Sequence, residues 1–287
     1  MGVEYQSLVK ELVTVTFVKI GYIGTTIIIE ALLDERSART DLKMRTVACG
    51  VSMDEADAAE VSKIAAGIES DLYIVVSPNA ALPGPKKARE ILKETGKPII
   101  AISDEPSRKA MKELPAEGMG YIVVYGDPMI GAVTAFLDPI EMAIFNGDVL
   151  KVLSVTGIFR LIQSEIDRVI DEIKEGKKPV LPEIVITKLT ALQHSGLVNP
   201  YAYAKGLAAF EMSRNVADLT TEGVFKTEDR LEIIQKVAAA HELIRQAAKL
   251  SDEAREIEKA NDSVERIAHF KGGDRRKKTE LYGKHEK

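Results

Sequence analysis

Several residue types are scarce in this 287-residue sequence, and each scarcity excludes a class of protein. A single cysteine, Cys49, excludes internal disulfides and a multi-cysteine metal site, which fits a reducing cytoplasm. Tryptophan is absent and aromatic residues make up only 5%, so the stacking platforms that bind single-stranded nucleic acid are not expected. The formal charge of −5 also argues against a nucleic-acid-binding protein. The four histidines are too scattered for a zinc motif: His194, His241, His269 and His285.

Long uninterrupted hydrophobic runs are missing as well. A membrane-spanning helix needs about 20 predominantly apolar residues. The apolar run from Leu12 to Leu33 is interrupted by charged residues and glycines, namely Lys19, Gly21, Gly24 and Glu30. It therefore predicts a strand, a glycine turn and a helix, and no secretory signal is visible. With 45% hydrophobic and 29% charged residues, the composition is that of an ordinary soluble globular protein with no membrane segment.

The first part of the chain alternates β-rich runs with amphipathic helical stretches. The expected strands are Val13–Ile20, Arg45–Ala48, Leu72–Ser77, Pro98–Ser103 and Tyr121–Tyr125. Several are nearly continuous apolar runs, as is typical of a parallel sheet that is covered on both faces. The alternation predicts an α/β, Rossmann-like sheet domain, followed by a mainly helical domain with a small β element.

Three parts of the chain are expected from this pattern. Residues 1–128 form an α/β cofactor-binding domain, in which residues 1–12 are an N-terminal arm. Residues 129–270 form a helical domain with a small β insertion near 182–190. Residues 271–287 form a basic tail with seven Lys or Arg against three Asp or Glu, which indicates a loosely held extension.

Three loops follow predicted strands and carry glycine or proline: Gly21–Thr26, Ser77–Pro85 and Gly126–Gly131. In an open parallel sheet, ligands bind at the carboxyl ends of the strands. We therefore expect the three loops to meet at one edge of the sheet and to form a cleft. The alternative for Gly21–Thr26 is a plain strand-to-helix turn.

Acidic residues gather after the third of these loops. Asp127 follows a strand, and Asp138 and Glu141 stand at the start of a helix. Together they indicate an acidic pocket edge that suits a ligand which becomes cationic. The alternative for Asp138 is an N-cap, with Glu141 completing a capping box.

The sequence contains no recognisable nucleophile with its base. No Ser-His-Asp or Cys-His arrangement can be assembled, and there is no Walker loop. The G-x-x-G spacing of Gly21 and Gly24 also lacks the nicotinamide dinucleotide fingerprint. A rigid cleft with carboxylates suits redox chemistry that a bound cofactor carries.

Two further groups of polar residues accompany the long helix predicted at Glu228–Lys259. His241 lies on its apolar stripe, where it is either a catalytic histidine or a hydrogen-bonded core residue. Asn261, Asp262 and Arg266, with His269, follow the end of the helix and could contact a heterocycle. A helix C-cap explains only part of this second group.

These residues carry a resemblance to a known family. The chain resembles the coenzyme F420-dependent methylenetetrahydromethanopterin dehydrogenases of methanogenic and related archaea. The resemblance extends from about Phe17 to about Lys278. The segments that carry it include Phe17-Val-Lys with Gly21 and Gly24, Pro83-Gly-Pro-Lys-Lys-Ala-Arg-Glu90, Asp127-Pro-Met-Ile-Gly-Ala132, Phe136-Leu-Asp-Pro139, Glu141-Met-Ala143, Asn199-Pro-Tyr-Ala202 and Asn261-Asp262.

The resemblance implies a cytoplasmic homo-oligomer, expected to be a hexamer, that binds coenzyme F420 and a tetrahydromethanopterin-type C1 carrier and no metal. It implies reversible hydride transfer between the two, with Asp127, Asp138 and Glu141 stabilising the methenyl cation. The implied cofactor-binding residues are Lys19, Gly21, Ile23, Gly24, Thr25, Asn79, Pro83, Gly84, Pro128 and Met129. The implied substrate-binding residues are Asn146, His241, Asn261, Asp262, Arg266 and His269.

The chain departs from the family pattern at Ile20-Gly21-Tyr22, at Val133-Thr134 and at Pro78-Asn-Ala-Ala-Leu82. All three departures lie at the expected cofactor end. They leave two alternatives open, which are a paralogue that uses a nicotinamide cofactor and a non-catalytic pterin-binding relative. The acids and Asn261-Asp262 together favour the enzyme.

Overall fold

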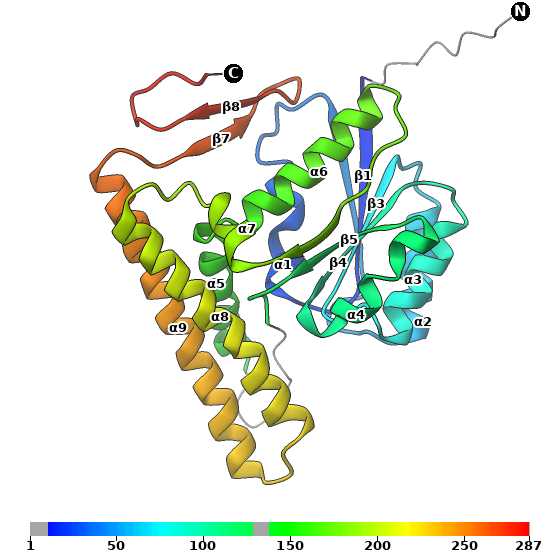
Figure 1. The fold of residues 1–287 in the computed structure, drawn as a ribbon. Coiled ribbons are helices and arrows are strands. Elements are labelled where there is room, and N and C mark those ends of the chain that lie inside the picture. The colour runs from blue at the N-terminus through cyan, green and yellow to red at the C-terminus, as the bar shows by residue number, and fades with distance from the viewer. Residues whose placement is uncertain (1–10, 129–137, 287) are drawn as a thin grey trace, which may run out of the picture.

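A six-stranded parallel sheet organises the computed structural model, which describes residues 11–128 and 138–286 (Figure 1). The order of the strands is β2-β1-β3-β4-β5-β6, and every neighbouring pair is parallel. The strands are β1 (Val13–Lys19), β2 (Leu42–Ala48), β3 (Leu72–Ser77), β4 (Ile99–Asp104), β5 (Gly120–Val124) and β6 (Glu183–Ile186). The predicted α/β class with a parallel sheet is therefore confirmed.

Helices cover both faces of this sheet, which explains why β3, β4 and β5 are buried along their whole length. On one face lie α2 (Glu55–Ala66), α3 (Pro83–Lys93) and α4 (Arg108–Met111). On the other face lie α1 (Gly24–Ile28), α5 (Pro139–Val155) and α6 (Ile158–Lys174). Three short 3-10 turns complete the layers, at Ile29–Leu32, Glu105–Ser107 and Leu114–Glu117.

A long helical pair extends beyond the sheet. It follows α7 (Lys188–Gln193) and consists of α8 (Pro200–Phe225) and α9 (Arg230–Ala260). The 31 residues of α9 correspond to about 46 Å of helix. Small buried residues such as Ala240, Ala247 and Ala254 let α9 pack closely on its neighbours. The predicted helical second part with a small β element is confirmed.

The strand near residues 182–190 differs from its predicted position. The sequence predicts a small β insertion among helices, whereas β6 is the sixth strand of the main sheet and pairs with β5 from Tyr121↔Glu183 to Val124↔Ile186. The intervening α5 and α6 act as a long crossover that returns the chain to the sheet edge. Strand β6 has only four residues, and of these only Ile186 is fully buried. Its hydrophobic pattern is therefore too short to predict the pairing with β5.

The basic tail also differs from the expected loose extension. Residues Arg275–Lys278 form β8, which pairs with β7 (Arg266–His269) as a two-stranded antiparallel sheet. Within it, Arg275 pairs with Asp171, which is 104 positions away, so sequence proximity does not reveal this contact. The division of the chain into separate domains at residues 128 and 270 stays a prediction.

Within the described residues, no single helix is both long and apolar enough to cross a membrane. Only α5 and α6 taken together have the length and hydropathy, and they are bent by 67° where they meet.

Candidate functional site

The loops after β1 and β3 meet at the carboxyl edge of the sheet. Ile20 N–H donates to the carbonyl of Val76 at 2.9 Å, and Gly21 turns the chain with a φ of +81°. A Cβ on Gly21 would stand 2.8 Å from Cδ of Pro78. The strand order reverses between β1 and β3, and such a switch point is where open α/β sheets bind ligands.

Asp127, three residues after β5, ties the third loop to the same turn. Its Oδ1 accepts from Gly24 N–H at 2.6 Å, and its Oδ2 accepts from Thr25 N–H at 2.7 Å. The side chain is fully buried, which raises its pKa to about 6 although the hydrogen bonds from Thr25 and Gly24 act to lower it. Asp127 thus caps the N-terminus of α1 from another loop. A Cβ on Gly24 would stand 2.8 Å from Oδ1 of Asp127, so this contact needs glycine.

Asp138 and Glu141 occupy the first turn of α5. Oδ1 of Asp138 accepts from the N–H groups of Ile140 at 2.8 Å and Glu141 at 2.7 Å, which confirms the expected N-cap. The carboxylate of Glu141 is directed to α9, where its Oε1 lies 3.1 Å from Nδ1 of His241. Glu141 is 39% exposed, whereas His241 is only 8% exposed.

His241 is held by a second residue of α5. The ring of Phe145 lies 4.6 Å from the His241 ring at an angle of 42°. Burial lowers the pKa of His241, although the hydrogen bond and charge of Glu141 act to raise it. The sequence reasoning did not select Phe145, although its i,i+4 spacing from Glu141 places both side chains on the face that meets α9.

Asn146 lies on the same helix and is half-buried. At about 100° per residue it is directed about 140° around the helix from Glu141. Asp148 instead returns to the face of Glu141, and partial burial raises its pKa. The sequence analysis did not select Asp148.

The expected cofactor residues near β1 border a cavity of about 210 Å³. Lys19 and Gly21 line it, with Tyr22, Thr26, Ile27, Thr46, Ala48 and Gly50. The ammonium group of Lys19 is 2.7 Å from the carboxylate of Glu30, a partner that sequence reasoning missed. Ile23 and Thr25 are buried beneath this turn, where Ile23 N–H donates to Oγ1 of Thr26 at 3.2 Å.

The loop after β3 is fixed by its own side chains. Oδ1 of Asn79 accepts from Ala81 N–H at 3.0 Å, and the exposed Pro83 begins α3. A Cβ on Gly84 would collide with the carbonyl of Met53, so Gly84 permits a close backbone approach. Pro128 is buried after Asp127, and Met129 lies outside the described residues.

The other expected substrate residues lie at or beyond the C-terminal end of α9. Asn261 ends α9 about twenty residues after His241, which is about 30 Å along a helix. Its amide donates to the carbonyl of Ile257 at 2.8 Å. Oδ1 of Asp262 accepts from Leu281 N–H at 2.9 Å, and Arg266 donates to the carbonyl of Thr279 at 2.6 Å. Asp262 and Arg266 therefore hold the C-terminal segment near the end of α9, whereas the amide of Asn261 bonds back to its own helix.

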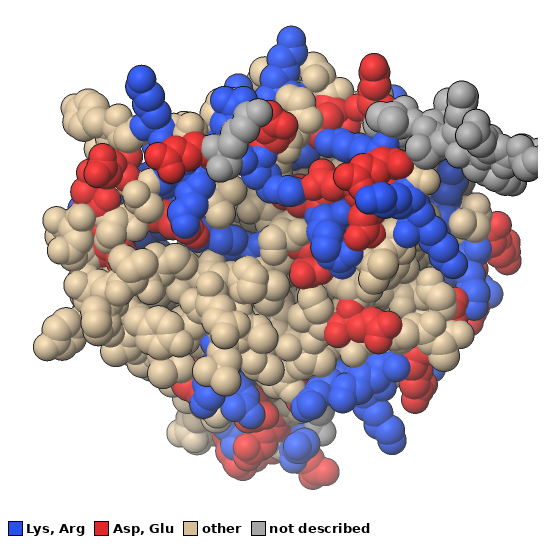
Figure 2. Space-filling view, turned by 45° about the horizontal axis from the view of Figure 1, so that its top comes forward, with Lys and Arg blue, Asp and Glu red and all other residues tan. Residues whose placement is uncertain are grey.

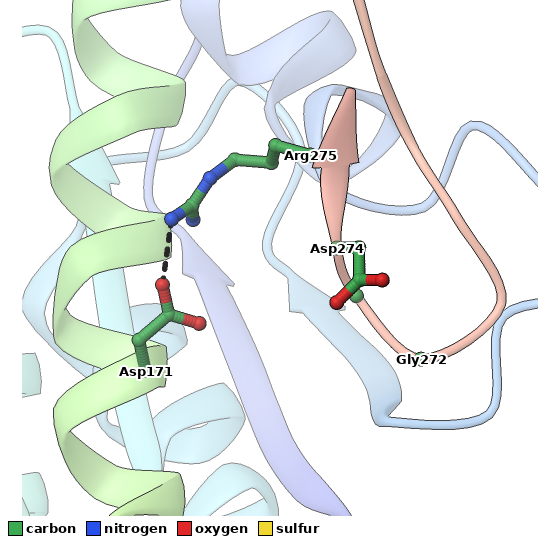
Figure 3. Close-up of a pocket in the computed structure, with 5 residues that line it drawn as sticks. Asp171, Gly272, Asp274 and Arg275 are labelled. Carbon is green, nitrogen blue, oxygen red and sulfur yellow. Dashed lines mark hydrogen bonds and ion pairs between the residues drawn. The ribbon is translucent and has the colours of Figure 1, made fainter. Parts of the chain in front are cut away.

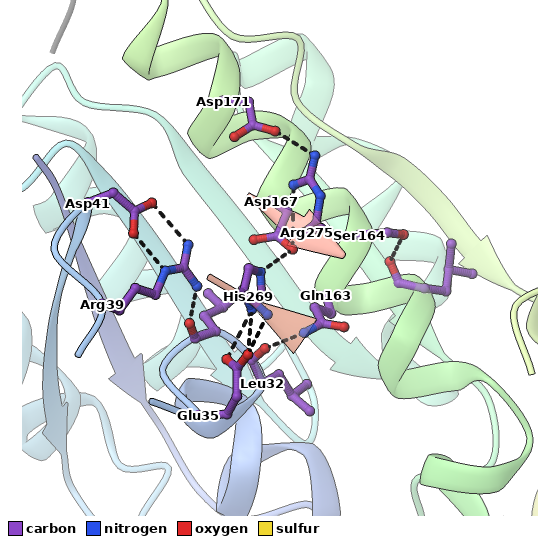
Figure 4. A network of polar contacts seen from close by, with 12 residues as sticks. Leu32, Glu35, Arg39, Asp41, Gln163, Ser164, Asp167, Asp171, His269 and Arg275 are labelled. Atoms are coloured by element: carbon purple, nitrogen blue, oxygen red, sulfur yellow. Dashed lines mark hydrogen bonds and ion pairs between the residues drawn. The ribbon is translucent and has the colours of Figure 1, made fainter. Parts of the chain in front are cut away.

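His269 lies between two carboxylates. Its Nδ1 is 3.0 Å from Oε2 of Glu35, and its Nε2 is 2.8 Å from Oδ2 of Asp167 on α6 (Figure 4). Burial acts to lower the pKa of His269, but the hydrogen bond and charge of Asp167 outweigh it, and the pKa is raised. With 1% of its surface exposed and both nitrogens engaged, this ring has no position from which to reach a ligand.

Arg275 of β8 reaches across to Asp171 of α6 at 2.7 Å (Figure 3). We call His269, Glu35, Asp167, Asp171 and Arg275 the C-terminal clamp. Beside it, Asp41 is paired with Arg39 and with Lys174. The clamp holds the β7–β8 hairpin against α6 and the segment before β2.

Fold and site together define an α/β protein whose loops after β1 and β3 meet at the switch point, with a cavity beside β1 and β2 and no assembled nucleophile among the described residues. In that part of the chain, no group of three His, Cys, Asp or Glu side chains could hold a metal ion. This architecture suits an oxidoreductase that relies on a bound organic coenzyme.

Comparison with known proteins specifies the family. Residues 13–286 match the family model of methylene-5,6,7,8-tetrahydromethanopterin dehydrogenase. The F420-dependent methylenetetrahydromethanopterin dehydrogenase of Archaeoglobus fulgidus is 50% identical over 274 residues, which is 96% of this chain and 99% of that protein. The enzyme of Methanocaldococcus jannaschii is 46% identical over 275 residues, with the same coverage of both chains.

A solved structure agrees with both sequence comparisons. It is an F420-dependent methylene-tetrahydromethanopterin dehydrogenase in complex with methylene-tetrahydromethanopterin and coenzyme F420. It superposes with a TM-score of 0.93 at 41% identity, over 96% of this chain and 100% of the other. The chain belongs to the methylenetetrahydromethanopterin dehydrogenase family, as its motifs predicted.

Proposed function

We infer that the protein transfers a hydride reversibly between methylene-tetrahydromethanopterin and coenzyme F420. The observation that carries this is the likeness, over 96% of the chain, to a dehydrogenase solved with both of these molecules. The hydride leaves the methylene carbon with both electrons of its C–H bond, so the product is a methenyl cation. When bound, the coenzyme supplies the hydride acceptor, and a solvent proton completes its reduction.

The residues after β1 offer a suitable place for a flat ring. The cavity of about 210 Å³ has apolar walls at Ile27 and Ala48 and polar groups at Lys19 and Thr46. Tyr22 is 41% exposed beside it and adds an aromatic surface. We place the coenzyme ring at this edge, where Gly21 allows the backbone to approach it closely.

Among the three acids, the geometry favours Glu141 as the charge that meets the developing cation. Asp127 is buried with both oxygens on backbone N–H groups, and Asp138 caps α5. Glu141 retains exposed surface, and its carboxylate is contacted by a buried histidine. We therefore assign Asp127 and Asp138 to shaping the edge and Glu141 to electrostatic stabilisation.

A cofactor exchange experiment tests the activity. Purified protein is mixed with methylene-tetrahydromethanopterin and oxidised F420, and the coenzyme absorbance is followed with NAD and NADP in parallel reactions. Rapid bleaching of F420 alone is the expected result. Reduction of a nicotinamide instead would support the paralogue, and no reduction of any acceptor would support a non-catalytic relative.

We propose that the protein is a homo-oligomer, expected to be a hexamer, in the cytoplasm. Large apolar side chains that are more than half exposed occur on α5, on α7 and around the start of α8: Ile140, Ile144, Leu189, Val198 and Tyr201. Figure 2 shows a broad face with few charged side chains. Such surface is typical of subunit contacts. Light scattering after gel filtration should give six chains, and a monomeric mass would contradict this.

A further inference from the structure

The contact between α5 and α9 joins an exposed acid to a buried histidine. Nδ1 of His241 lies 3.1 Å from Oε1 of Glu141. Phe145 packs against the same ring, so the imidazole is fixed from two positions on α5. Of the pair, the carboxylate is the member that retains surface open to a ligand, because His241 is 8% exposed and Glu141 is 39% exposed.

The chemistry of the contact determines which atom carries the proton. An ionised carboxylate only accepts hydrogen bonds, so Nδ1 of His241 is the donor. Burial lowers the pKa of His241, so its ring is neutral at pH 7 and has its single proton on Nδ1. A neutral donor orients the carboxylate without cancelling its charge, whereas a lysine or arginine in the same place would form an ion pair and weaken the field of the acid.

We propose that His241 is a positioning residue, which holds Glu141 as an oriented and uncancelled negative charge beside the carbon that becomes cationic. This inference rests on the proposed function. It replaces direct substrate contact as the role of His241, because the ring is buried behind the carboxylate it contacts. Phe145 completes the arrangement by restricting the rotation of the ring.

Two substitutions of His241 separate positioning from packing. His241→Asn keeps an amide N–H near the place of Nδ1, whereas His241→Leu has similar bulk and no donor. We expect His241→Leu to lower kcat about 10-fold to 100-fold with KM nearly unchanged, as supporting residues commonly do. His241→Asn should recover most of that loss. Thermal unfolding of each variant reports any structural damage separately.

The same substitutions in a Glu141→Gln background make the experiment decisive. If His241 acts through the charge of Glu141, His241→Leu should cost less than about 2-fold once that charge is gone. An equal loss in both backgrounds, a failure of His241→Asn to recover activity, or a rise in KM at unchanged kcat would each overturn the proposal. If Glu141→Gln alone turns over within a few-fold of the parent, the electrostatic assignment and the positioning role both fail.

A measurement on the ligand-free protein distinguishes these failures from failure of the proposed function. NMR of the ring nitrogens can resolve the four histidines of the chain, with His241→Asn identifying the signal. At pH 7 we expect a neutral ring with its proton on Nδ1, and a changed Nδ1–H signal in Glu141→Gln. A ring protonated on both nitrogens, or on Nε2 alone, would contradict the positioning role whatever substrate the protein uses.

Discussion

Two buried aspartates of this molecule have their pKa values shifted in opposite directions. Asp127, at the carboxyl edge of the sheet, is held by two backbone N–H groups, and burial raises its pKa to about 6. Asp41, beside the C-terminal clamp, is held by Arg39 and Lys174. Burial acts to raise the pKa of Asp41, but its two cations outweigh this and lower it to about 2. Both residues are at most 5% exposed, and the difference between them is that Asp41 has two cations beside it.

The two buried histidines repeat the contrast. Burial lowers the pKa of His241 between α5 and α9, whereas the carboxylate of Asp167 raises the pKa of His269 in the clamp. The clamp matches each charge with an opposite one and fastens a hairpin. Asp127, Asp138 and Glu141 are instead held by neutral donors, which suits a ligand that becomes positively charged during the reaction.

The largest expected effect is on stability, from Asp41→Asn. The variant leaves the buried guanidinium of Arg39 without its carboxylate, and such a loss costs on the order of 3–5 kcal/mol. Turnover by the folded fraction should change less than about 2-fold, because the clamp lies away from the edge. Urea unfolding and kcat measure the two quantities. As a control, Glu256→Gln breaks the exposed pair with Lys259 and should cost under about 1 kcal/mol.

Two glycine-to-alanine substitutions test, in the same way, whether stability and turnover depend on the close packing at the carboxyl edge of the sheet. On Gly24 a Cβ would stand 2.7 Å from Cγ1 of Val149 and close to Asp127, so Gly24→Ala should cost about 1–3 kcal/mol. It should also lower turnover at least about 10-fold by moving the turn after β1. Gly147→Ala is the matched control. Among described residues no heavy atom lies within 4 Å of its Cβ position, and alanine should stabilise α5 by up to about 1 kcal/mol. Equal effects of the two would contradict this account.

The pH dependence of stability should have opposite signs in the two regions. The folded-state pKa of Asp41 is about 2, below its ordinary 3.8, so its contribution exists above about pH 4 and is lost as the pH falls towards 2. The pKa of Asp127 is raised to about 6, so its contribution is greatest below about pH 4 and declines as the pH rises to 6. Urea unfolding of Asp41→Asn and Asp127→Asn across pH 2–7 should show opposite slopes relative to the parent; parallel curves would contradict it.

The smallest expected effect is that of Asp138→Asn. Asparagine caps helices about as well as aspartate, so stability should change by less than about 0.5 kcal/mol. Because Asp138 is assigned to capping, turnover should stay within about 3-fold. Asp138→Ala should cost about 1 kcal/mol of stability through the lost cap. Enzyme assays with thermal unfolding measure both, and a large loss of kcat in Asp138→Asn would make this acid an electrostatic residue.

The features that were predicted correctly from the sequence are those that short local motifs determine. The apolar runs of β3 and β4, the cap at Asp138 and the loops gathered at the carboxyl edge all follow from short motifs. The sequence did not predict the pairing of β6 with β5. It also did not predict the clamp, because Glu35 and His269 are 234 positions apart, and each residue, considered by itself, resembles an ordinary solvent-exposed side chain. Val133 and Thr134, with Met129, lie outside the described residues, so their expected effect on the coenzyme stays a prediction.

The most direct test of the account is the single-turnover rate of hydride transfer in Glu141→Gln. With methylene-tetrahydromethanopterin and F420 both saturating, the bleaching of the coenzyme reports the chemical step. Removing a preorganised charge from a developing cation should slow this step on the order of 10²–10³-fold, with coenzyme affinity within about 3-fold of the parent. A rate within a few-fold of the parent would show that the charge of Glu141 does not stabilise the methenyl cation.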